Sequence, residues 1–397
     1  MTRSDGGALA GLRILELGDE KGEYCGRLLA GMGADVVKLE PPGGSPTRRF
    51  PPFRGDVVDP ERSLHFWHYN VGKRSVVLDL ETDAGPAQLA RLAARADVLI
   101  ESLPPGELER HGVGHRQLSE INPRLVLASI TPFGQEGPLR DAAASDLTLM
   151  ALGGSMAVCG YGPAADGVYD TPPLACEANQ AYQTACIYAA QAIVAAVIHA
   201  EAGGEGQWID VSIHEAATSL TEWHLPAFWS SGSIVPRAIL GLQFRCRDGV
   251  WASTLLADFL GPRVFDDLVE ILDAEGLAGE LRADERLRDP AYRRQHPGAI
   301  ERALEQLCAR HTADEVYRIG QAKGFPWASI RTPDENLDDL HLRDRGFFVP
   351  VEHPELGAVF PYPGGPFVAG ATPWRFARRP PAIGEHTAEV VSEWGVE

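Results

Sequence analysis

Short apolar runs alternate with amphipathic stretches along the first 130 residues of the chain. This alternation of strand-length and helix-length patterns is typical of repeated βαβ units, and it predicts a parallel sheet wrapped in helices. Ligands of such sheets bind at the carboxyl ends of the strands. We expect strands within residues 12–17, 35–42, 73–80, 97–103 and 123–130, and helices within residues 23–34 and 84–96.

The second half of the chain differs from the first in composition and in the spacing of its apolar residues. A long Ala-rich helix is expected at 181–202, followed by a glycine turn, a strand and another helix. From about residue 218 the chain is richer in Asp, Glu and Arg, and its apolar positions have helical spacing. A length of 397 residues is more than one hydrophobic core usually serves. We therefore predict a second, smaller and mainly helical domain in this region.

Composition and net charge argue against some classes of binding partner. The net charge of −19 argues against general binding of nucleic acid or anionic membranes, although a local basic pocket remains compatible with it. The six cysteines form no CxxC pair and no Cys/His cluster, so we expect free thiols and no bound metal. The first residues lack a signal-peptide pattern, and no run of about 18 apolar residues occurs. A cytoplasmic protein is the expectation.

Cationic side chains stand near predicted strand ends. Asn70, Lys73 and Arg74 directly precede the strand within 73–80, and two cations with an amide suit a polyphosphate ligand. Arg110 follows a rigid Pro-Pro-Gly turn that would present it to a ligand. The alternatives are a solvated strand end and an ordinary surface arginine. From the residues alone, these patterns predict an anionic-nucleotide pocket but no reaction.

Several longer segments together resemble the class III CoA-transferases, the family that includes formyl-CoA and carnitine CoA-transferases and α-methylacyl-CoA racemase. Each segment is moderately specific, but they occur in order across nearly the whole chain. The segments are GRLLAGMGADVVKLEPPGGSPTR from residue 26, YNVGKRSVVLDL from residue 69, GPLRDAAASDLTLMALGG from residue 137, GGEGQWIDVSIHEA from residue 203 and PPAIGEHTAEV from residue 380.

The resemblance implies an α/β fold with a Rossmann-like large domain built from both chain ends. Residues 1–217 and 342–397 would form this domain, and residues 218–341 would supply linkers and an inserted smaller, mainly helical α/β domain. Two such chains interlock as a dimer in the family. Coenzyme A, as free CoA or acyl-CoA substrate, would lie on the large domain close to the cationic residues named above.

The family's chemistry uses an Asp carboxylate that attacks the acyl-CoA. A mixed anhydride forms, followed by an aspartyl-CoA thioester, and a second acid then collects the CoA. Counting back from the Ala-rich helix, the position of this Asp falls on Tyr182, which cannot form the anhydride. Glu177 is the only acid between Pro172 and Ala200, so it is the candidate nucleophile.

Other activities stay open. The racemase branch of the family has a His where this chain has Ser145, which disfavours a racemase. Some CoA-transferases of the family are heteromers in which only one chain carries the Asp, and a chain with Tyr182 resembles the other one. The remaining alternatives are another CoA-dependent enzyme on this fold, such as a lyase or dehydratase, and a non-catalytic acyl-CoA-binding partner chain.

Overall fold

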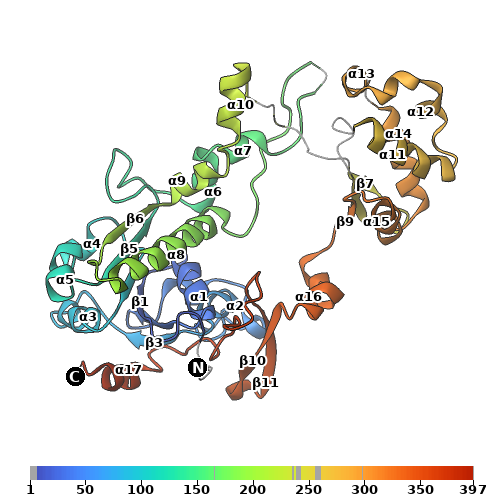
Figure 1. Ribbon diagram of the computed structural model, residues 1–397. Coiled ribbons are helices and arrows are strands. Elements are labelled where there is room, and N and C mark those ends of the chain that lie inside the picture. Colours follow the sequence, from blue (N-terminus) through green and yellow to red (C-terminus); the bar gives the residue numbers. More distant parts are fainter. Residues whose placement is uncertain are drawn as a thin grey trace. The chain divides into compact units, whose positions relative to one another are not determined.

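The computed structural model describes residues 7–164, 166–234, 237, 243–254, 261–296 and 298–396. The chain forms two compact units (Figure 1). The large unit comprises Met1–Cys159, Pro173–Pro236 and Leu340–Glu397, and the small unit comprises Gly160–Pro172 and Arg237–Asp339. The large unit thus takes in both ends of the chain. The domain boundaries at 217/218 and 341/342 stay a prediction.

A six-stranded parallel sheet forms the centre of the large unit, which confirms the predicted α/β class. Its strand order is β3-β2-β1-β4-β5-β6, so the chain runs outward from β1 in one direction and then from β4 in the other. The strands are β1 (Arg13–Leu17), β2 (Asp35–Glu40), β3 (Arg74–Val77), β4 (Val98–Glu101), β5 (Val126–Thr131) and β6 (Trp208–Ser212).

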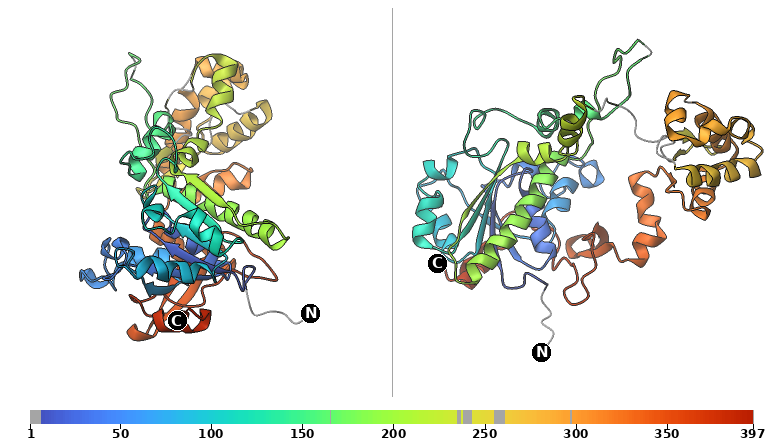
Figure 2. Two further views of the ribbon diagram at one scale, coloured as in Figure 1. Left: turned by 90° about the vertical axis from the view of Figure 1, so that its left-hand side faces the viewer. Right: turned by 45° about the horizontal axis from the view of Figure 1, so that its top comes forward.

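Helices cover both faces of the sheet (Figure 2). Successive residues of a strand point to opposite faces, so Ile14 joins one buried cluster and Leu15 the other. The first face carries α1 (Glu23–Gly31), α6 (Asp146–Leu152), α8 (Gln180–Glu201) and α9 (Ile213–Ser219). The second face carries α3 (Gly85–Ala93), α4 (Glu107–Arg110), α5 (His115–Ile121) and α17 (Thr387–Trp394). The fold is therefore doubly wound.

Helix α8 is long and apolar enough to cross a membrane by length and composition, with a mean hydropathy of 1.5 over 18 residues. Half of that window is buried, and Ala185, Ala189 and Ile193 contribute to the core on the first face of the sheet. A core helix of a soluble protein passes the same test. The packing of α8 is that of such a core helix.

The C-terminal segment returns to the large unit through a short helix, α16 (Leu340–Asp344), and an antiparallel hairpin of β10 (Phe348–His353) and β11 (Ala358–Pro363). It then covers the free edge of β3. His386 N–H donates to the Ser75 carbonyl at 3.0 Å, and Val77 N–H donates to Thr387 Oγ1 at 3.2 Å. A covered edge strand offers no unpaired backbone for aggregation.

The small unit has its own buried core. Its described residues include three short antiparallel strands, β7 (Gln243–Arg245), β8 (Trp251–Ser253) and β9 (Ala328–Ser329). Its mainly helical character agrees with the amphipathic spacing in the sequence. Trp327, 1% exposed, lies within this core. The helices are α11 (Pro262–Ala274), α12 (Gly279–Ala283), α13 (Pro290–Gln295), α14 (Ala299–Arg310) and α15 (Ala313–Ala322).

A charged network lies buried between the sheet and α1. The Lys73 ammonium donates to both oxygens of Glu16 at 2.8 and 2.7 Å, and Lys38 pairs with Glu16 at 3.2 Å and Glu23 at 2.8 Å. These two lysines and two glutamates are almost completely buried, and their charges cancel. Gly26 of α1 makes room for the network, since a Cβ there would stand 1.7 Å from Glu16 Oε2.

We expect Gly26→Ala to lower the free energy of unfolding by about 1–2 kcal/mol. Alanine favours a helix by up to about 1 kcal/mol, but the new methyl group would push against a carboxylate held by two lysines, and overpacking costs about 1–3 kcal/mol. Urea unfolding measures the change. Gly370→Ala, where a Cβ would meet open space, is the matched control. Equal stability of the two variants would contradict the tight approach.

Glu101, the last residue of β4, is a second buried acid and is only 4% exposed. The Leu103 N–H donates to its Oε2 at 2.7 Å. Burial raises the pKa of Glu101 to about 7, although hydrogen bonds from Ser129 and Leu103 oppose this. The folded state therefore favours the protonated carboxyl group in weakly acidic solution.

This pKa predicts a loss of stability as the pH rises. The pKa of Glu101 is 4.5 in the unfolded chain and about 7 in the folded one. The stability that the protonated carboxyl group contributes is therefore fully present below pH 4.5 and is lost above pH 7. We expect Glu101→Gln, measured by urea unfolding at pH 5 and pH 8, to gain up to about 3 kcal/mol on the wild type across this range. Glu120→Gln, at an exposed site, should track the wild type. Parallel pH profiles of Glu101→Gln and wild type would refute the assignment.

Candidate active site

The strand order reverses between β1 and β4, and open α/β sheets bind ligands in the crevice outside this point. Two loops border the crevice, residues 18–22 after β1 and residues 102–106 after β4. They are joined directly. The Asp19 N–H donates to Ser102 Oγ at 3.0 Å, and Ser102 Oγ–H donates to Asp19 Oδ1 at 2.9 Å. Gly18 permits this contact, since a Cβ there would lie 2.1 Å from Ser102 Oγ.

The buried network holds the 18–22 loop at both ends. Lys38 Nζ donates to the Gly18 carbonyl at 3.2 Å, and Lys73 Nζ donates to the Glu23 carbonyl at 2.9 Å. Both lysines are completely buried, so the charged groups that hold the loop from beneath are shielded from solvent. The network thus gives the crevice a pre-formed wall.

The crevice holds a cavity of about 440 Å³ with both charged and apolar walls. Arg140, from the loop after β5, is its main cation. Its buried Nε makes no hydrogen bond to any residue that the structure describes and lies 3.4 Å from an oxygen of Asp141. An arginine with spare donors suits an anionic ligand. The lining consists of Asp19, Lys21, Ser102–Pro105, Pro132 and Arg140–Ala144.

Asn70 and Lys73, expected near CoA, lie in the core and are 0% exposed. The Asn70 Oδ1 accepts from Lys73 Nζ at 3.0 Å, and its Nδ2 donates to the Phe66 carbonyl at 3.1 Å. The Lys73 ammonium also binds Glu16 and the Glu23 carbonyl, as described above. In this arrangement both side chains act on the 18–22 loop from beneath it. Their contact with CoA stays a prediction.

Arg74 lies at the amino end of β3, because it begins this strand and stands beside Val37 of β2. It pairs with Asp35, and its Nη1 also lies 3.1 Å from Glu389 and 2.7 Å from Glu393 of α17. These contacts attach the C-terminal helix to the sheet. The structure therefore does not bring Arg74 together with the crevice, and its role in binding also stays a prediction.

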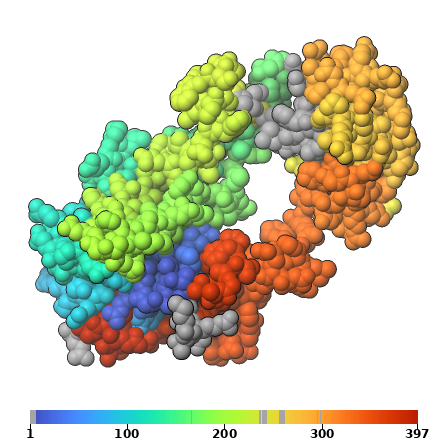
Figure 3. All heavy atoms as spheres, viewed as in Figure 1, coloured from blue at the N-terminus to red at the C-terminus, as the bar shows by residue number. Residues whose placement is uncertain are grey.

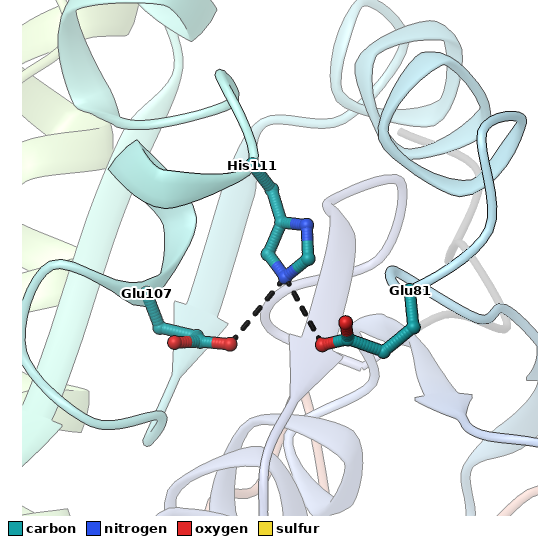
Figure 4. A group of neighbouring side chains, drawn as sticks. All are labelled: Glu81, Glu107 and His111. Atoms are coloured by element: carbon teal, nitrogen blue, oxygen red, sulfur yellow. Dashed lines mark ion pairs between the residues drawn. The ribbon is translucent and has the colours of Figure 1, made fainter.

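Arg110 stands on the surface at the carboxyl side of the sheet, with 55% of its side chain exposed. It pairs with Glu81 at 2.8 Å and with Glu107, and both carboxylates lie 3.4 Å from His111 Nε2 (Figure 4). The geometry of these two acids and one histidine would also allow a metal ion. The Arg110 guanidinium already neutralises the same oxygens, so an ion would have to displace it.

Tyr182 lies in the first turn of α8 and is 7% exposed. The preceding Asn179 makes no side-chain cap, and an acid from α6 takes its place: Asp146 Oδ1 accepts the Tyr182 N–H at 3.1 Å. Burial, followed by the charges of Glu20, Asp146 and Asp19, raises the pKa of Tyr182 to about 12. The phenol therefore stays protonated near neutral pH.

Glu177 lies three residues before α8 and has an exposed side chain. A turn separates it from the helix, since Ala178 and Asn179 have left-handed φ angles of 72° and 56°. The Gln180 side chain donates to the Glu177 carbonyl at 3.0 Å, which fixes the backbone of this turn. The position of Glu177 neither joins it to the crevice nor tests its proposed role as nucleophile.

Arg140, Glu20 and Asp146 were not among the site residues expected from the sequence. Each follows a predicted strand end or a Gly-rich loop, and that position is the signal that could have found them. Their residue types alone do not distinguish these three from the other charged residues of the sequence.

Comparison with known proteins agrees with this architecture. The model of CoA-transferase family III matches residues 9–387. The succinyl-CoA:(R)-benzylsuccinate CoA-transferase subunit BbsE of Thauera aromatica is 34% identical, over 96% of this chain and 93% of its own length. The succinyl-CoA–D-citramalate CoA-transferase of Chloroflexus aurantiacus is 29% identical, over 96% and 92%.

A solved structure extends the likeness to the fold. A CAIB/BAIF family protein from Brucella suis superimposes with a TM-score of 0.83 at 27% identity, over 98% of this chain and all of that one. The doubly wound sheet, the return of the C-terminus and the family match across the chain lead to one conclusion. The chain belongs to CoA-transferase family III, and its activity is the transfer of CoA between an acyl-CoA and a carboxylic acid.

Proposed function

We propose that this chain takes CoA from succinyl-CoA and passes it to a second carboxylic acid, in an assembly with another chain of the same family. The observation that carries the proposal is the family match together with the names of the two relatives, which are both succinyl-CoA-dependent CoA-transferases. We also propose a cytoplasmic location, because this compartment contains acyl-CoA esters and keeps thiols reduced.

CoA would bind in the crevice at the switch point. Arg140 and Lys21 line the cavity there and supply positive charge for the phosphates. Arg110, at the same edge, could reach a phosphate from the surface, while Asn70 and Lys73 would act through the loop they hold. Arg74 begins its strand, so it lies at the end of the sheet opposite the crevice.

The nucleophile has two sources within this proposal. Glu177 is the acid that the sequence offers, and its exposed position leaves it accessible. The alternative is an Asp on a partner chain, which is supported by Tyr182 in this chain and by the subunit status of the BbsE relative. A non-catalytic partner chain is the second candidate function, and Tyr182 is the observation that favours it.

Exposed apolar side chains support the assembly. Helix α10 (His224–Ser231) buries none of its residues in the large unit, and it lies at the surface in Figure 3. Trp223 is 72% exposed, Phe228 43% and Trp229 78%. Large exposed apolar side chains that gather along one segment are typical of protein interfaces. An interlocked dimer, homomeric or heteromeric, would bury it.

Isotope exchange tests the activity without knowledge of the second acid. The chain, alone and co-purified with any partner, is incubated with succinyl-CoA and radiolabelled succinate. A CoA-transferase is expected to move label into succinyl-CoA, because succinyl-CoA donates its CoA and the labelled succinate accepts it. No exchange in either preparation would rule out succinyl-CoA as the donor.

Arg140→Ala is expected to weaken CoA binding by about 1–3 kcal/mol, the scale of a charge-assisted hydrogen bond. Arg110→Ala should weaken it less, because Glu81 and Glu107 already neutralise this guanidinium. Titration calorimetry with CoA measures both. Arg318→Ala, which removes an exposed arginine of the small unit, is the control. Affinity of Arg140→Ala equal to that of the control would remove Arg140 from the site.

Trp229→Glu is expected to shift the assembly toward monomers, by at least about 30-fold in dissociation constant, since a central aromatic contact contributes about 2 kcal/mol or more. Light scattering at micromolar concentration gives the mass. Val58→Glu replaces an equally exposed apolar side chain outside α10 and is the control. A monomeric wild-type protein would contradict the proposed assembly.

A further inference from the structure

The loop after β1 lies against the face of α8 that carries Tyr182. Cys186 stands one helical turn after Tyr182, both are buried, and residues four apart share a helix face. The Cys186 thiol donates to the Lys21 carbonyl at 3.1 Å. The backbone of the 18–22 loop therefore runs beside the start of α8, where the resemblance to the family places its nucleophilic Asp.

The loop and the first residue of α1 carry three acids, Asp19, Glu20 and Glu23, and other side chains bind two of them. Asp19 accepts from Ser102 Oγ and from the Lys21 N–H and pairs with the Lys21 ammonium. Glu23 pairs with Lys38 and accepts from Thr47 Oγ1 at 2.7 Å. Within the residues that the structure describes, no other side chain donates to the carboxylate of Glu20. Burial, with Asp19 adding to it, raises the pKa of Glu20.

The position of Glu20 suits a reacting group. The residues on either side of it, Asp19 and Lys21, line the cavity of the crevice. Lys38 and Lys73 hold the two ends of the loop, so the backbone of Glu20 is fixed before any substrate binds. Among the acids around Tyr182, Asp146 already caps α8, which leaves Glu20 as the acid without a structural task.

We infer that Glu20 is the nucleophile of this chain, so that the carboxylate lost from α8 at Tyr182 is supplied by the loop that faces it. The inference rests on the proposed CoA-transferase activity and replaces Glu177 and the partner chain as the source of the acid. It concerns an acyl-CoA whose thioester enters the crevice from the side of Arg140.

The chemistry balances without any further reagent. A Glu20 oxygen attacks the thioester carbonyl carbon, the carbon–sulfur bond breaks, CoA leaves as the thiolate, and the acyl group stays on Glu20 as a mixed anhydride. The thiolate then attacks the Glu20 carbonyl carbon, releases the first carboxylate and leaves CoA on Glu20 as a thioester. The second acid runs the same two steps in reverse, with no net proton or electron transferred.

Hydroxylamine trapping tests the inference on the full chain. Protein incubated with succinyl-CoA is treated with hydroxylamine, which converts an acylated or thioesterified carboxyl group to a hydroxamate, and mass spectrometry locates it. We expect the label on Glu20. We also expect Glu20→Gln to lose at least about 1,000-fold in succinate exchange, since removal of a covalent nucleophile costs at least this much. Glu120→Gln, an exposed acid on α5, should keep both label and exchange.

The outcomes separate the inference from the activity on which it rests. A label on Glu177 or on a co-purified chain, or exchange by Glu20→Gln within two-fold of wild type, would overturn the role of Glu20 and leave the CoA-transferase intact. Absence of exchange in every preparation would remove both. Unchanged CoA affinity of Glu20→Gln by calorimetry would show that a loss of exchange reflects chemistry. The label on the wild-type chain decides the case if this variant does not fold.

Discussion

The buried ion pairs of Lys73 and Lys38 with Glu16 and Glu23 are the interaction on which the rest of the large unit depends. Removing one partner of such a network leaves an uncompensated charge in the core and costs about 3–5 kcal/mol. The network also has a structural role, because the same two ammonium groups bind the carbonyls of Gly18 and Glu23 at the ends of one loop. The same two lysines thus neutralise the buried glutamates and fix the loop at the edge of the sheet.

Several other features follow from this network. Helix α1 needs Gly26 where it passes over Glu16, since any side chain would displace a pinned carboxylate. Loop 18–22 can meet Ser102 across the switch point only with Gly18 at its start. The crevice is consequently formed before a ligand arrives, and a pre-formed site avoids the ordering cost that a flexible loop would add to binding.

The start of α8 keeps its structure with Tyr182 at the position where the resemblance to the family places an Asp. Asp146 of α6 accepts the first backbone N–H groups of the helix, so the helix end does not depend on residue 182 for its cap. Tyr182 fills the position with a buried ring and a phenol that stays protonated. Fold and assembly can persist there while the acid comes from elsewhere, either from the facing loop or from another chain.

The sequence by itself determined the parallel sheet, its strands, the helical small unit and the family, because these depend on local periodicity and on motifs that are continuous in the chain. The arrangement of the site required the tertiary structure. Lys73 directly precedes β3 and Arg74 begins it. Although they are neighbours in sequence, Lys73 enters the core network and Arg74 binds α17 at the amino end of the sheet. Glu16 lies 57 residues from Lys73, and Tyr182 is 162 positions from Glu20; no local pattern records such pairings. Only the packing of α8 against the loop after β1 showed which acid lies near Tyr182, at the edge of the sheet where we propose that CoA binds.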